Sequence, residues 1–451
     1  MNNKPLAIII LAAGQGTRMK SNRPKVMHEL AGRPMINWLL ETCESFGPEK
    51  IVVVTGPDMP GLEAAIKPHT GVVQKVRDGT GGAVKCAISA LKGFTGDVLI
   101  LLGDTPLLTV ETMQTLIQTK TENKASLSLL GCIMENSYGY GRLILNEKDE
   151  LQEIVEEKDA DEEQKQIRLV NTGAFCADGA RLESWLEKID NNNAQNEFYI
   201  TQLPAIIAAE GGKTAVAITK DAAEIHGCNT RADLAALEKT LQSRLRTRHM
   251  NEGVSMQDPD TVYLWHDTQI APGCTLEPNI YFGPNVSIAE NVTIRAFSHI
   301  EETTIGSGVA VGPFARLRGG AKLAQDVKIG NFVEIKNAEL AHGVKANHLA
   351  YLGDAAIGEN TNIGAGTITC NYNGFEKNKT MIGKNVFVGS NAALVAPVTI
   401  ENDAIIAAGS TVTENVPADA LAIARAATEI RKGWAAKYRK IKEAAKRKKA
   451  S

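Results

Sequence analysis

The sequence lacks the features of disulfide-stabilised, zinc-binding, membrane-spanning and nucleic-acid-binding proteins. Its seven cysteines, at positions 43, 86, 132, 176, 228, 274 and 370, form no CxxC pair and no regular spacing. This pattern argues against a disulfide framework or a structural zinc, and favours a reducing, cytoplasmic compartment. No apolar run approaches the roughly 20 residues that span a bilayer, so we expect no membrane segment. The net charge of −3 argues against a broad nucleic-acid surface.

A glycine-rich loop follows the first apolar run. Leu6 to Ala13 has little positive charge before it and continues into "GQGTRMK", so we interpret it as a buried strand rather than a signal segment. The loop lacks the third glycine of a dinucleotide fingerprint and the Gly-Lys-Ser/Thr of a P-loop. Gly14 and Gly16 still allow backbone N–H groups to point at a phosphate. With the positive charges of Arg18 and Lys25, the loop predicts a phosphate site, the alternative being an ordinary strand-to-helix turn.

Short apolar runs alternate with amphipathic stretches up to about residue 228. Strands are predicted at Ala7–Leu11, Lys50–Thr55 and Val98–Leu102, and helices at Met35–Phe46 and Val110–Thr119. Such alternation predicts a mainly parallel sheet with helices on both faces. Ligands of these sheets bind at the carboxyl ends of strands, where both the glycine loop and "LLGD" at 101–104 fall.

The second half of the chain has a different periodicity. Leucines at helical spacing (Leu234, Leu237, Leu241 and Leu245) predict a linking helix over 230–250, closed by Gly253. Beyond it an aliphatic or aromatic residue recurs every six positions, which is typical of a parallel β-helix. The repeat comprises Ile270, Leu276, Phe282, Ile288, Ile294 and Ile300; Ile305, Val311, Leu317, Leu323, Ile329 and Ile335; Leu340, Ala346 and Leu352; Ile357 and Ile363; and Ile382, Val388, Leu394, Ile400, Ile406 and Val412.

Two segments of this half depart from the repeat. Thr369 to Thr380, "TCNYNGFEKNKT", interrupts it, and an insertion in a solenoid maps to a projecting loop that commonly carries function. The last residues, 437–451, are strongly basic. We interpret them as a solvated, partly disordered tail. The alternatives are a specific role, such as lying against a phosphate-bearing ligand, and a weak nucleic-acid contact.

Ordered motifs in both halves carry a resemblance to known enzymes. "LAAGQGTRMKS", "RPK", "QKVRDGTGGA", "LLGDTPLL", "YGR", "IVEEKDA", "VNTG", "NEFYIT" and "GCNTR" occur as in sugar-phosphate nucleotidyltransferases. With "PFARLR", "GNFVEIKNA", "HLAYLGDA", "NIGAGTITCNYNG" and "VFVGSNAALVAP", the chain resembles bacterial bifunctional enzymes that join such a domain to an N-acetyltransferase. The implied fold is α/β: a Rossmann-like nucleotidyltransferase domain over 1–229, a linking helix over 230–250, and a left-handed parallel β-helix of hexapeptide repeats over 251–451.

For the first domain the resemblance implies uridylyl transfer from UTP to N-acetylglucosamine 1-phosphate, with release of pyrophosphate. Arg18 and Lys25 would stabilise phosphate charge, and Asp104 and Asn229 would hold Mg²⁺. Within the set below, Gln74, Gly79 and Thr80 would read the uracil. The implied nucleotide and sugar contacts are Leu11, Ala12, Ala13, Gly14, Gln74, Gly79, Thr80, Leu102, Gly103, Gly141, Glu156 and Asn171.

For the second domain the resemblance implies acetyl transfer from acetyl-CoA to the 2-amino group of glucosamine 1-phosphate, in a homotrimer with active sites between subunits. His348 would be the general base and Glu334 would orient its ring. The implied sugar-phosphate contacts are Arg318, Lys336, Tyr351, Asn362, Asn371 and Tyr372, and the implied acetyl-CoA contacts are Ala365, Ser390, Ala408 and Arg425. The alternatives for His348 are a structural histidine, or a zinc shared with His342 across subunits.

Three positions differ from the family pattern: "RLRGG" lacks the usual proline, Gly82 replaces a common histidine, and Thr230 replaces an asparagine or aspartate. Two alternatives for the whole chain are a single-activity nucleotidyltransferase with a regulatory β-helix, and a β-helix that serves only for trimerisation. We expect a cytoplasmic enzyme with small-molecule substrates, no nucleic-acid or membrane partner, and a place in the supply of peptidoglycan and lipopolysaccharide precursors.

Overall fold

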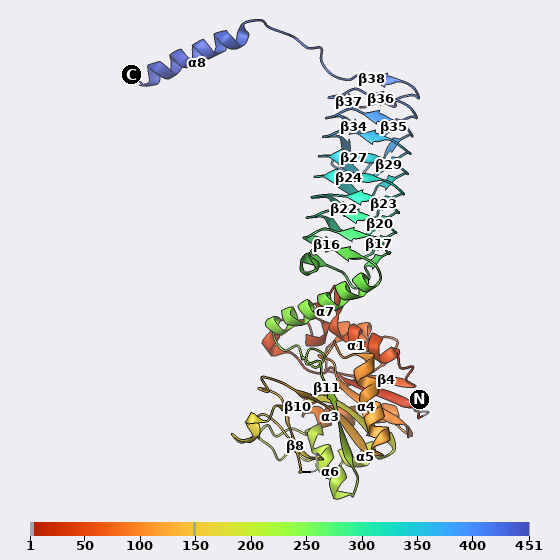
Figure 1. The fold of residues 1–451 in the computed structure, drawn as a ribbon, viewed down its shortest axis with the longest axis vertical. Coiled ribbons are helices and arrows are strands. Elements are labelled where there is room, and N and C mark those ends of the chain that lie inside the picture. Colours follow the sequence, from red (N-terminus) through yellow and green to blue (C-terminus); the bar gives the residue numbers. More distant parts are fainter. Residues whose placement is uncertain (1–3, 148–149, 451) are drawn as a thin grey trace. The chain divides into compact units, whose positions relative to one another are not determined.

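The computed structural model describes residues 4–147 and 150–450. It divides the chain into two compact units, Met1–Thr247 and Arg248–Ser451. Figure 1 shows an α/β fold in the first unit and a stack of short coils in the second. Among the described residues, no helix is both long and apolar enough for a membrane span.

The first unit is built on one sheet, whose main path runs β11-β7-β10-β6-β1-β4-β5. Only β10 is antiparallel to its neighbours on this path, so the prediction of a mainly parallel sheet is confirmed. Its strands are β1 (Leu6–Leu11), β4 (Lys50–Thr55), β5 (Thr70–Val73), β6 (Asp97–Leu102), β7 (Leu127–Ile133), β10 (Leu169–Asp178) and β11 (Thr214–Thr219), with β8 (Arg142–Leu145) and β9 (Leu151–Val155) attached beside β10, and β2 (Glu29–Leu30) and β3 (Arg33–Pro34) forming a separate hairpin.

Helices cover both faces of this sheet because its central strands are apolar on both sides. In β1, Ile8 and Ile10 pack into one buried cluster with α1 and α4, while Ala7 and Ile9 pack into another with α3 and α5. A strand buried on both faces reads as the continuous apolar run seen in the sequence. The helices are α1 (Met35–Glu44), α2 (Pro60–Ala65), α3 (Thr80–Ile88), α4 (Val110–Glu122), α5 (Gly179–Leu186) and α6 (Leu203–Ala209), with 3₁₀ turns η1 (Thr17–Met19), η2 (Lys25–Met27), η3 (Ser89–Leu91), η4 (Gln164–Gln166) and η5 (Ile200–Gln202).

The helix expected over 230–250 forms as α7 (Arg231–Asn251). Of its four spaced leucines, Leu237, Leu241 and Leu245 are buried, whereas Leu234 is partly exposed. Gly253 follows with a φ of +97°, a conformation that glycine adopts without steric strain.

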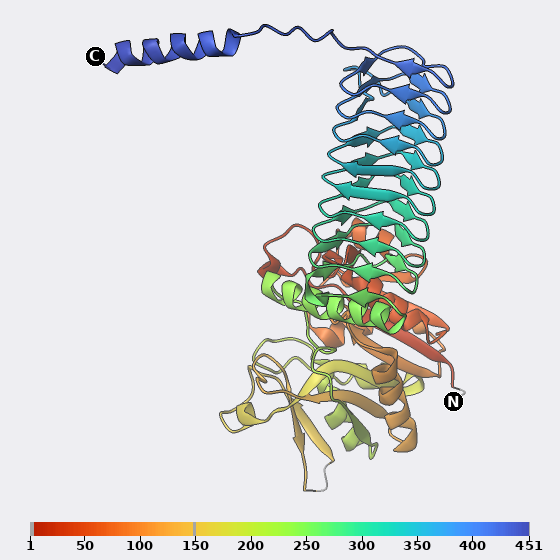
Figure 2. The ribbon, with the colours of Figure 1, turned by 45° about the horizontal axis from the view of Figure 1, so that its top comes forward.

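The second unit is a parallel β-helix of three sheets, and Figure 2 shows its stacked coils. A complete coil adds one strand to each sheet. The first sheet contains β12 (Ser255–Met256), β15 (Thr275–Leu276), β18 (Thr293–Ile294), β21 (Ala310–Val311), β24 (Lys328–Asn331), β27 (Lys345–His348), β30 (Asn362–Ile363), β33 (Phe387–Val388), β36 (Ile405–Ile406) and β38 (Leu421–Ala422). The second contains β13 (Val262–Tyr263), β16 (Ile280–Phe282), β19 (His299–Ile300), β22 (Arg316–Arg318), β25 (Glu334–Lys336), β28 (Tyr351–Gly353), β31 (Ile368–Cys370), β34 (Ala393–Val395) and β37 (Thr411–Val412). The third contains β14 (Gln269–Ile270), β17 (Val286–Ile288), β20 (Thr303–Ile305), β23 (Ala321–Leu323), β26 (Glu339–Leu340), β29 (Ala355–Ile357), β32 (Thr380–Ile382) and β35 (Val398–Ile400); the turn η6 (Pro259–Thr261) lies before β13.

The six-residue repeat sets the register of these sheets. Every residue of the predicted series is buried. Ile270 pairs with Ile288 on the next coil and Ile288 with Ile305, so equivalent positions stack one above another. The predicted β-helix is therefore confirmed, and its coils bury one continuous apolar core.

The inserted segment and the basic end differ in structure. The insertion lies between β31 and β32 and contains an isolated antiparallel bridge from Tyr372 to Lys377. The basic end forms a helix, α8 (Trp434–Ala450), rather than the partly disordered tail expected, because its alanines, lysines and arginines are strong helix formers. Residues 434–449 are all exposed, as expected for a solvated segment.

Candidate functional site

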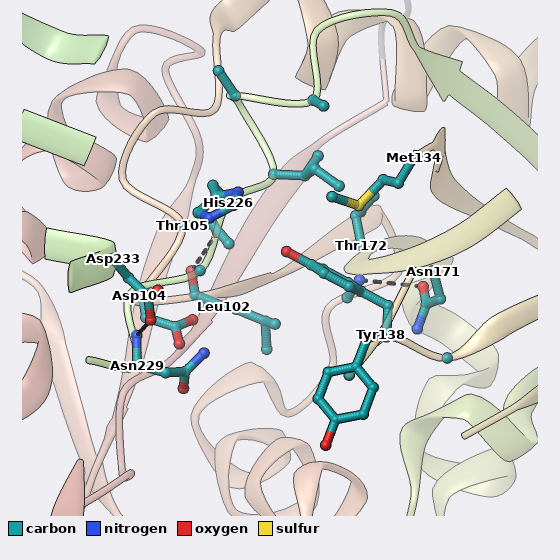
Figure 3. Close-up of a pocket in the computed structure, with 18 of the residues that line it drawn as sticks. Leu102, Asp104, Thr105, Met134, Tyr138, Asn171, Thr172, His226, Asn229 and Asp233 are labelled. Carbon is teal, nitrogen blue, oxygen red and sulfur yellow. Dashed lines mark hydrogen bonds between the residues drawn. The ribbon is translucent and has the colours of Figure 1, made fainter. Parts of the chain in front are cut away.

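Two adjoining cavities lie at the carboxyl ends of β1 and β6 in the first unit. The larger, of about 1100 Å³, is lined by residues that include Arg18, Asp104, Glu156 and Asn171. Figure 3 shows Asp104 and Asn229 side by side in it, with Asn171 and Tyr138 farther along. The smaller cavity, of about 290 Å³, is lined by the glycine loop and the expected uracil contacts: Leu11, Ala12, Ala13, Gly14, Lys25, Gln74, Gly79 and Thr80. Leu11, Leu102, Thr80 and Asp104 line both cavities, so the two are contiguous.

Two cations and two oxygen donors meet beside the glycine loop. The Lys25 ammonium contacts Asp104 Oδ2 and lies 3.3 Å from Asn229 Oδ1. Arg18 Nη2 donates to the same Asn229 oxygen at 2.9 Å. Gly16 makes this meeting possible: it has a φ of +65°, and an added Cβ would lie 2.7 Å from Lys25 Cβ.

Gly103, one of the expected nucleotide contacts, lies behind the loop rather than in a cavity. It lines neither of the two cavities, and its N–H donates to the Leu11 carbonyl oxygen at 2.9 Å. An added Cβ would lie 3.1 Å from that oxygen. The structure therefore places Gly103 as a close support of β1.

The far side of the larger cavity carries a carboxylate and an amide. Burial raises the pKa of Glu156, with further increases from Asp159 and Glu197, against a hydrogen bond from Thr201 that lowers it. Thr201 Oγ1 donates to Glu156 Oε1 at 3.0 Å. Asn171 is buried, and its N–H donates to the carbonyl oxygen of Gly141 at 2.8 Å, which places both residues beside Glu156.

An ion pair that we did not predict from the sequence lies beside this side of the larger cavity. Arg142 is 2% exposed and pairs with Glu157 at 2.6 Å. It also donates to the carbonyl oxygens of Tyr140 and, at 3.3 Å, of Lys165. Burial opposes the charge on Glu157, but hydrogen bonds from Arg142 and the Gly139 amide outweigh it and lower the Glu157 pKa. The "YGR" motif was the available signal.

In the second unit the candidate base is held by an amide. His348 is exposed, and its Nδ1 lies 2.8 Å from Asn331 Oδ1. Glu334, which we expected to orient this ring, instead accepts from Arg318 Nε at 2.7 Å, so that expectation is wrong for the described contacts. An amide oxygen only accepts, so Nδ1 carries a proton, and in the neutral ring Nε2 is then the nitrogen with the free lone pair.

A cluster of cations lies on neighbouring coils. Arg318 on β22 pairs in register with Lys336 on β25. The pKa of Lys336 is lowered, chiefly by close contact with Lys377 of the inserted loop. The sequence did not predict this contact of Lys377, because nothing in the loop's sequence indicates which coil the loop packs against. Three positive charges at one place predict an anion, such as a sugar phosphate.

Two amide groups contact Asp354 at this site, and one of them belongs to the expected residue Asn371. Asn371 Nδ2 contacts Asp354 Oδ2 and lies 3.5 Å from Tyr351 Oη. Asn337 Nδ2 donates to Asp354 Oδ1 at 2.6 Å. Tyr372 is 62% exposed and its hydroxyl donates to the Gly374 carbonyl within the loop. The structure thus brings Tyr351 and Asn371 together and leaves Tyr372 at the surface.

The expected acetyl-CoA residues form a column that begins at His348. Ala346 pairs with Ile363, Ile363 with Val388, and Val388 with Ile406. The residues two positions after these four are His348, Ala365, Ser390 and Ala408, so one of them lies on each successive coil. Arg425 Nη1 donates to the Ala408 carbonyl oxygen at 2.5 Å, and Asn362 lies on β30 of the same sheet.

Comparison with protein families agrees with the two units. The model of the MobA-like NTP transferase domain matches residues 8–137, which include the glycine loop and Asp104. The model of the bacterial transferase hexapeptide, with six repeats, matches residues 379–414. The fold and these matches define a two-part transferase: a nucleotidyltransferase domain followed by a left-handed β-helix of hexapeptide repeats.

Relatives match over the full length of the chain. "Bifunctional protein GlmU" of Zymomonas mobilis is 46% identical over 98% of this chain and 99% of its own. Those of Paramagnetospirillum magneticum and Sphingopyxis alaskensis are 45% and 47% identical, over 100% of this chain and 100% and 99% of theirs. The chain belongs to the GlmU family of bifunctional enzymes, with nucleotidyltransferase and acetyltransferase activities in UDP-N-acetylglucosamine synthesis. The predicted bifunctional enzyme is confirmed, and the single-activity and scaffold alternatives are set aside.

Proposed function

We propose that the first unit, through residues within 1–229, transfers uridylyl from UTP to N-acetylglucosamine 1-phosphate and releases pyrophosphate. The observation that carries this proposal is the meeting of Arg18 and Lys25 with the oxygens of Asp104 and Asn229 beside the glycine loop. Fixed cations there would stabilise the charge that develops on the α-phosphate and the leaving pyrophosphate. They lie where the nucleotide cavity joins the larger cavity, so both substrates would meet at them.

Asp104 and Asn229 suit a magnesium ion. A single ammonium, that of Lys25, contacts both Asp104 Oδ2 and Asn229 Oδ1, so these oxygens reach a common positive charge. Carboxylate and amide oxygens are ligands that this hard cation takes, together with phosphate oxygens and waters. When bound, Mg²⁺ supplies charge neutralisation at the phosphates. Lys25 and Arg18 would then exchange these oxygens for those of the substrates.

The remaining cavity residues divide between the two substrates. The glycine loop with Gln74, Gly79 and Thr80 would hold the uridine, because these residues line the smaller cavity. Gly141, Glu156 and Asn171 would hold the acetylated sugar, because all three line the larger cavity. Holding the sugar phosphate oxygen against the α-phosphate would supply much of the rate enhancement through orientation.

We infer that the second unit, within 251–451, acetylates the 2-amino group of glucosamine 1-phosphate. His348 Nε2 would take the proton of the ammonium form, and the free amine would attack the acetyl-CoA thioester with coenzyme A as leaving group. Arg318, Lys336 and Lys377 suit the sugar phosphate. The column from His348 to Ala408 gives the thioester a path along successive coils.

An exposed apolar column supports a homotrimer with the acetyl site between subunits. Phe297, Phe314, Phe332 and Leu349 are 53%, 45%, 55% and 61% exposed, all with positive φ, an uncommon state for large residues. The first three rings stack, with centroids 4.9 and 5.2 Å apart. Such a column marks an interaction surface. Phe314, Phe332, Asn331 and His348 line a common cavity, so a second copy placed there would complete the site.

We place the enzyme in the cytoplasm, because its seven cysteines form no CxxC pair and no regular spacing. A one-pot assay tests the whole proposal. The protein is given glucosamine 1-phosphate, acetyl-CoA, UTP and magnesium, while thiol and pyrophosphate are followed separately. Release of both, with pyrophosphate dependent on acetyl-CoA, is expected. Pyrophosphate with N-acetylglucosamine 1-phosphate but no thiol under any condition would refute the acetyltransferase assignment.

A further inference from the structure

The amide of Gln74 is held by two oxygen atoms at the edge of the smaller cavity. Gln74 is 4% exposed, and its Nε2 lies 3.0 Å from Asp78 Oδ1 and 3.2 Å from the Gly79 carbonyl oxygen. A carboxylate and a carbonyl can only accept hydrogen bonds. The amide nitrogen must therefore face both of them, and its two N–H bonds are used within the protein.

The amide oxygen is left for a ligand. Gln74 Oε1 accepts no hydrogen bond from the described residues. It is also not one of their fully buried polar atoms without a partner, so solvent or a ligand can reach it. Because Gln74 lines the smaller cavity, this oxygen is available to a base bound there. It can accept from the N3–H of uracil. Cytosine has an unprotonated acceptor nitrogen at the same place, and two acceptors facing each other repel.

Asp78 is accommodated by a glycine in the next helix. A Cβ added at Gly82, in the first turn of α3, would lie 2.0 Å from Asp78 Oδ1. The carboxylate therefore fills the space that a side chain at position 82 would take. Its location beside the start of α3 also favours negative charge, since helix N-termini carry a partial positive charge. Asp78 can hold this position because residue 82 has no side chain.

We propose that Asp78 is a positioning residue that fixes the Gln74 amide and thereby selects uracil over cytosine. This inference rests on the proposed uridylyl transfer. Without the Asp78 acceptor, the amide is free to turn by 180° and offer N–H to cytosine. The Gly79 carbonyl at 3.2 Å holds it alone and less firmly.

The test measures kcat/KM for UTP and CTP with N-acetylglucosamine 1-phosphate and magnesium, in the full-length protein and in Asp78→Ala and Asp78→Asn. In Asp78→Ala we expect the UTP to CTP ratio of kcat/KM to fall roughly tenfold, mainly through KM for UTP, from the loss of one buried hydrogen bond. Asp78→Asn keeps an acceptor oxygen and is expected to retain most of the selectivity. Glu63→Ala, at an exposed carboxylate on α2, is the matched control and is expected to keep the ratio.

The outcomes separate this inference from the proposed function. If the unsubstituted protein does not use UTP at all, the proposed function itself is refuted. If the unsubstituted protein prefers UTP and the Asp78→Ala variant has the same UTP to CTP ratio of kcat/KM, only the inference about Asp78 is overturned. Thermal unfolding reports whether Asp78→Ala folds. If that variant unfolds, Asp78→Leu serves instead, since leucine also removes the acceptor while filling the space beside Gly82.

Discussion

The hydrogen bond between Asn331 and His348 gives a quantitative prediction for acetyl transfer. The pair stands directly opposite in the register of β24 and β27, with 2.8 Å between Nδ1 and Oδ1. Replacing Asn331 by alanine removes this bond and the preference for the tautomer that leaves Nε2 free to act as a base. A neutral hydrogen bond contributes about 1 kcal/mol, and tautomer loss adds a similar amount. The hydrogen bond alone corresponds to a roughly 5-fold lower kcat, and both contributions together to a roughly 30-fold lower kcat.

A double-mutant cycle isolates the interaction. His348→Ala alone is expected to lower kcat by about 10²- to 10⁴-fold, the range for losing a general base. Once His348 is absent, Asn331 has no ring to orient, so the double variant should be no slower than His348→Ala. Asn331→Asp keeps an acceptor oxygen and should recover most of the activity.

The assay follows thiol release from acetyl-CoA with saturating glucosamine 1-phosphate, and uridylyl transfer is measured on the same samples as a control for folding. Fully additive losses in the double variant would refute the reasoning, since Asn331 would then act independently of His348. Equal losses in Asn331→Ala and Asn331→Asp would also contradict it, because only the first removes the acceptor.

Three further predictions concern the first unit and the tail. The pKa of Glu156 is raised by burial, so its ionisation costs stability as pH rises above about 4.3, the usual glutamate value; Glu156→Gln should raise Tm at pH 7 but not at pH 4, and raise KM for the sugar phosphate. Arg142→Met removes the ion pair with Glu157 and the hydrogen bonds to the Tyr140 and Lys165 carbonyl oxygens; since the Glu157 side chain is 20% exposed and can be solvated, the variant should destabilise the unit by about 1–3 kcal/mol in denaturant unfolding, and an unchanged midpoint would contradict this role of Arg142. Deleting residues 437–451 should leave uridylyl transfer intact, since no described side chain of 437–449 is buried; a collapse of that activity would show that the tail serves the first site.

The fold could be predicted from the sequence because its periods are local. A six-residue repeat fixes which side chain points inward in each coil, and Ile270, Ile288 and Ile305 then stack by the same rule. The strands of the first unit were visible as apolar runs because β1 and its neighbours are buried on both faces.

The supporting contacts of the site were harder to predict. Asn331 precedes His348 by 17 positions, which is one coil, so the repeat length was an available signal for this pair. Glu334, which the family resemblance implied as the partner of His348, pairs in register with Tyr351 and accepts from Arg318 instead. Arg142 and Lys377 depend on how a loop packs against distant chain, which no local pattern encodes. The α8 helix shows composition overriding charge: repulsion among its lysines does not prevent good helix formers from folding locally.

The insertion between β31 and β32 adds residues to the site without changing the register of the coils. Ile357 pairs with Ile382 across 25 positions, whereas Ile382 pairs with Ile400 across 18, so the coil resumes its register after the loop as though nothing had been added. Residues of the loop can therefore be exchanged, lengthened or recombined without changing the stacking that carries the fold. The coils thus carry both the apolar core and fixed site residues such as His348 and Arg318, while the inserted loop can add contacts such as that of Lys377 without shifting either.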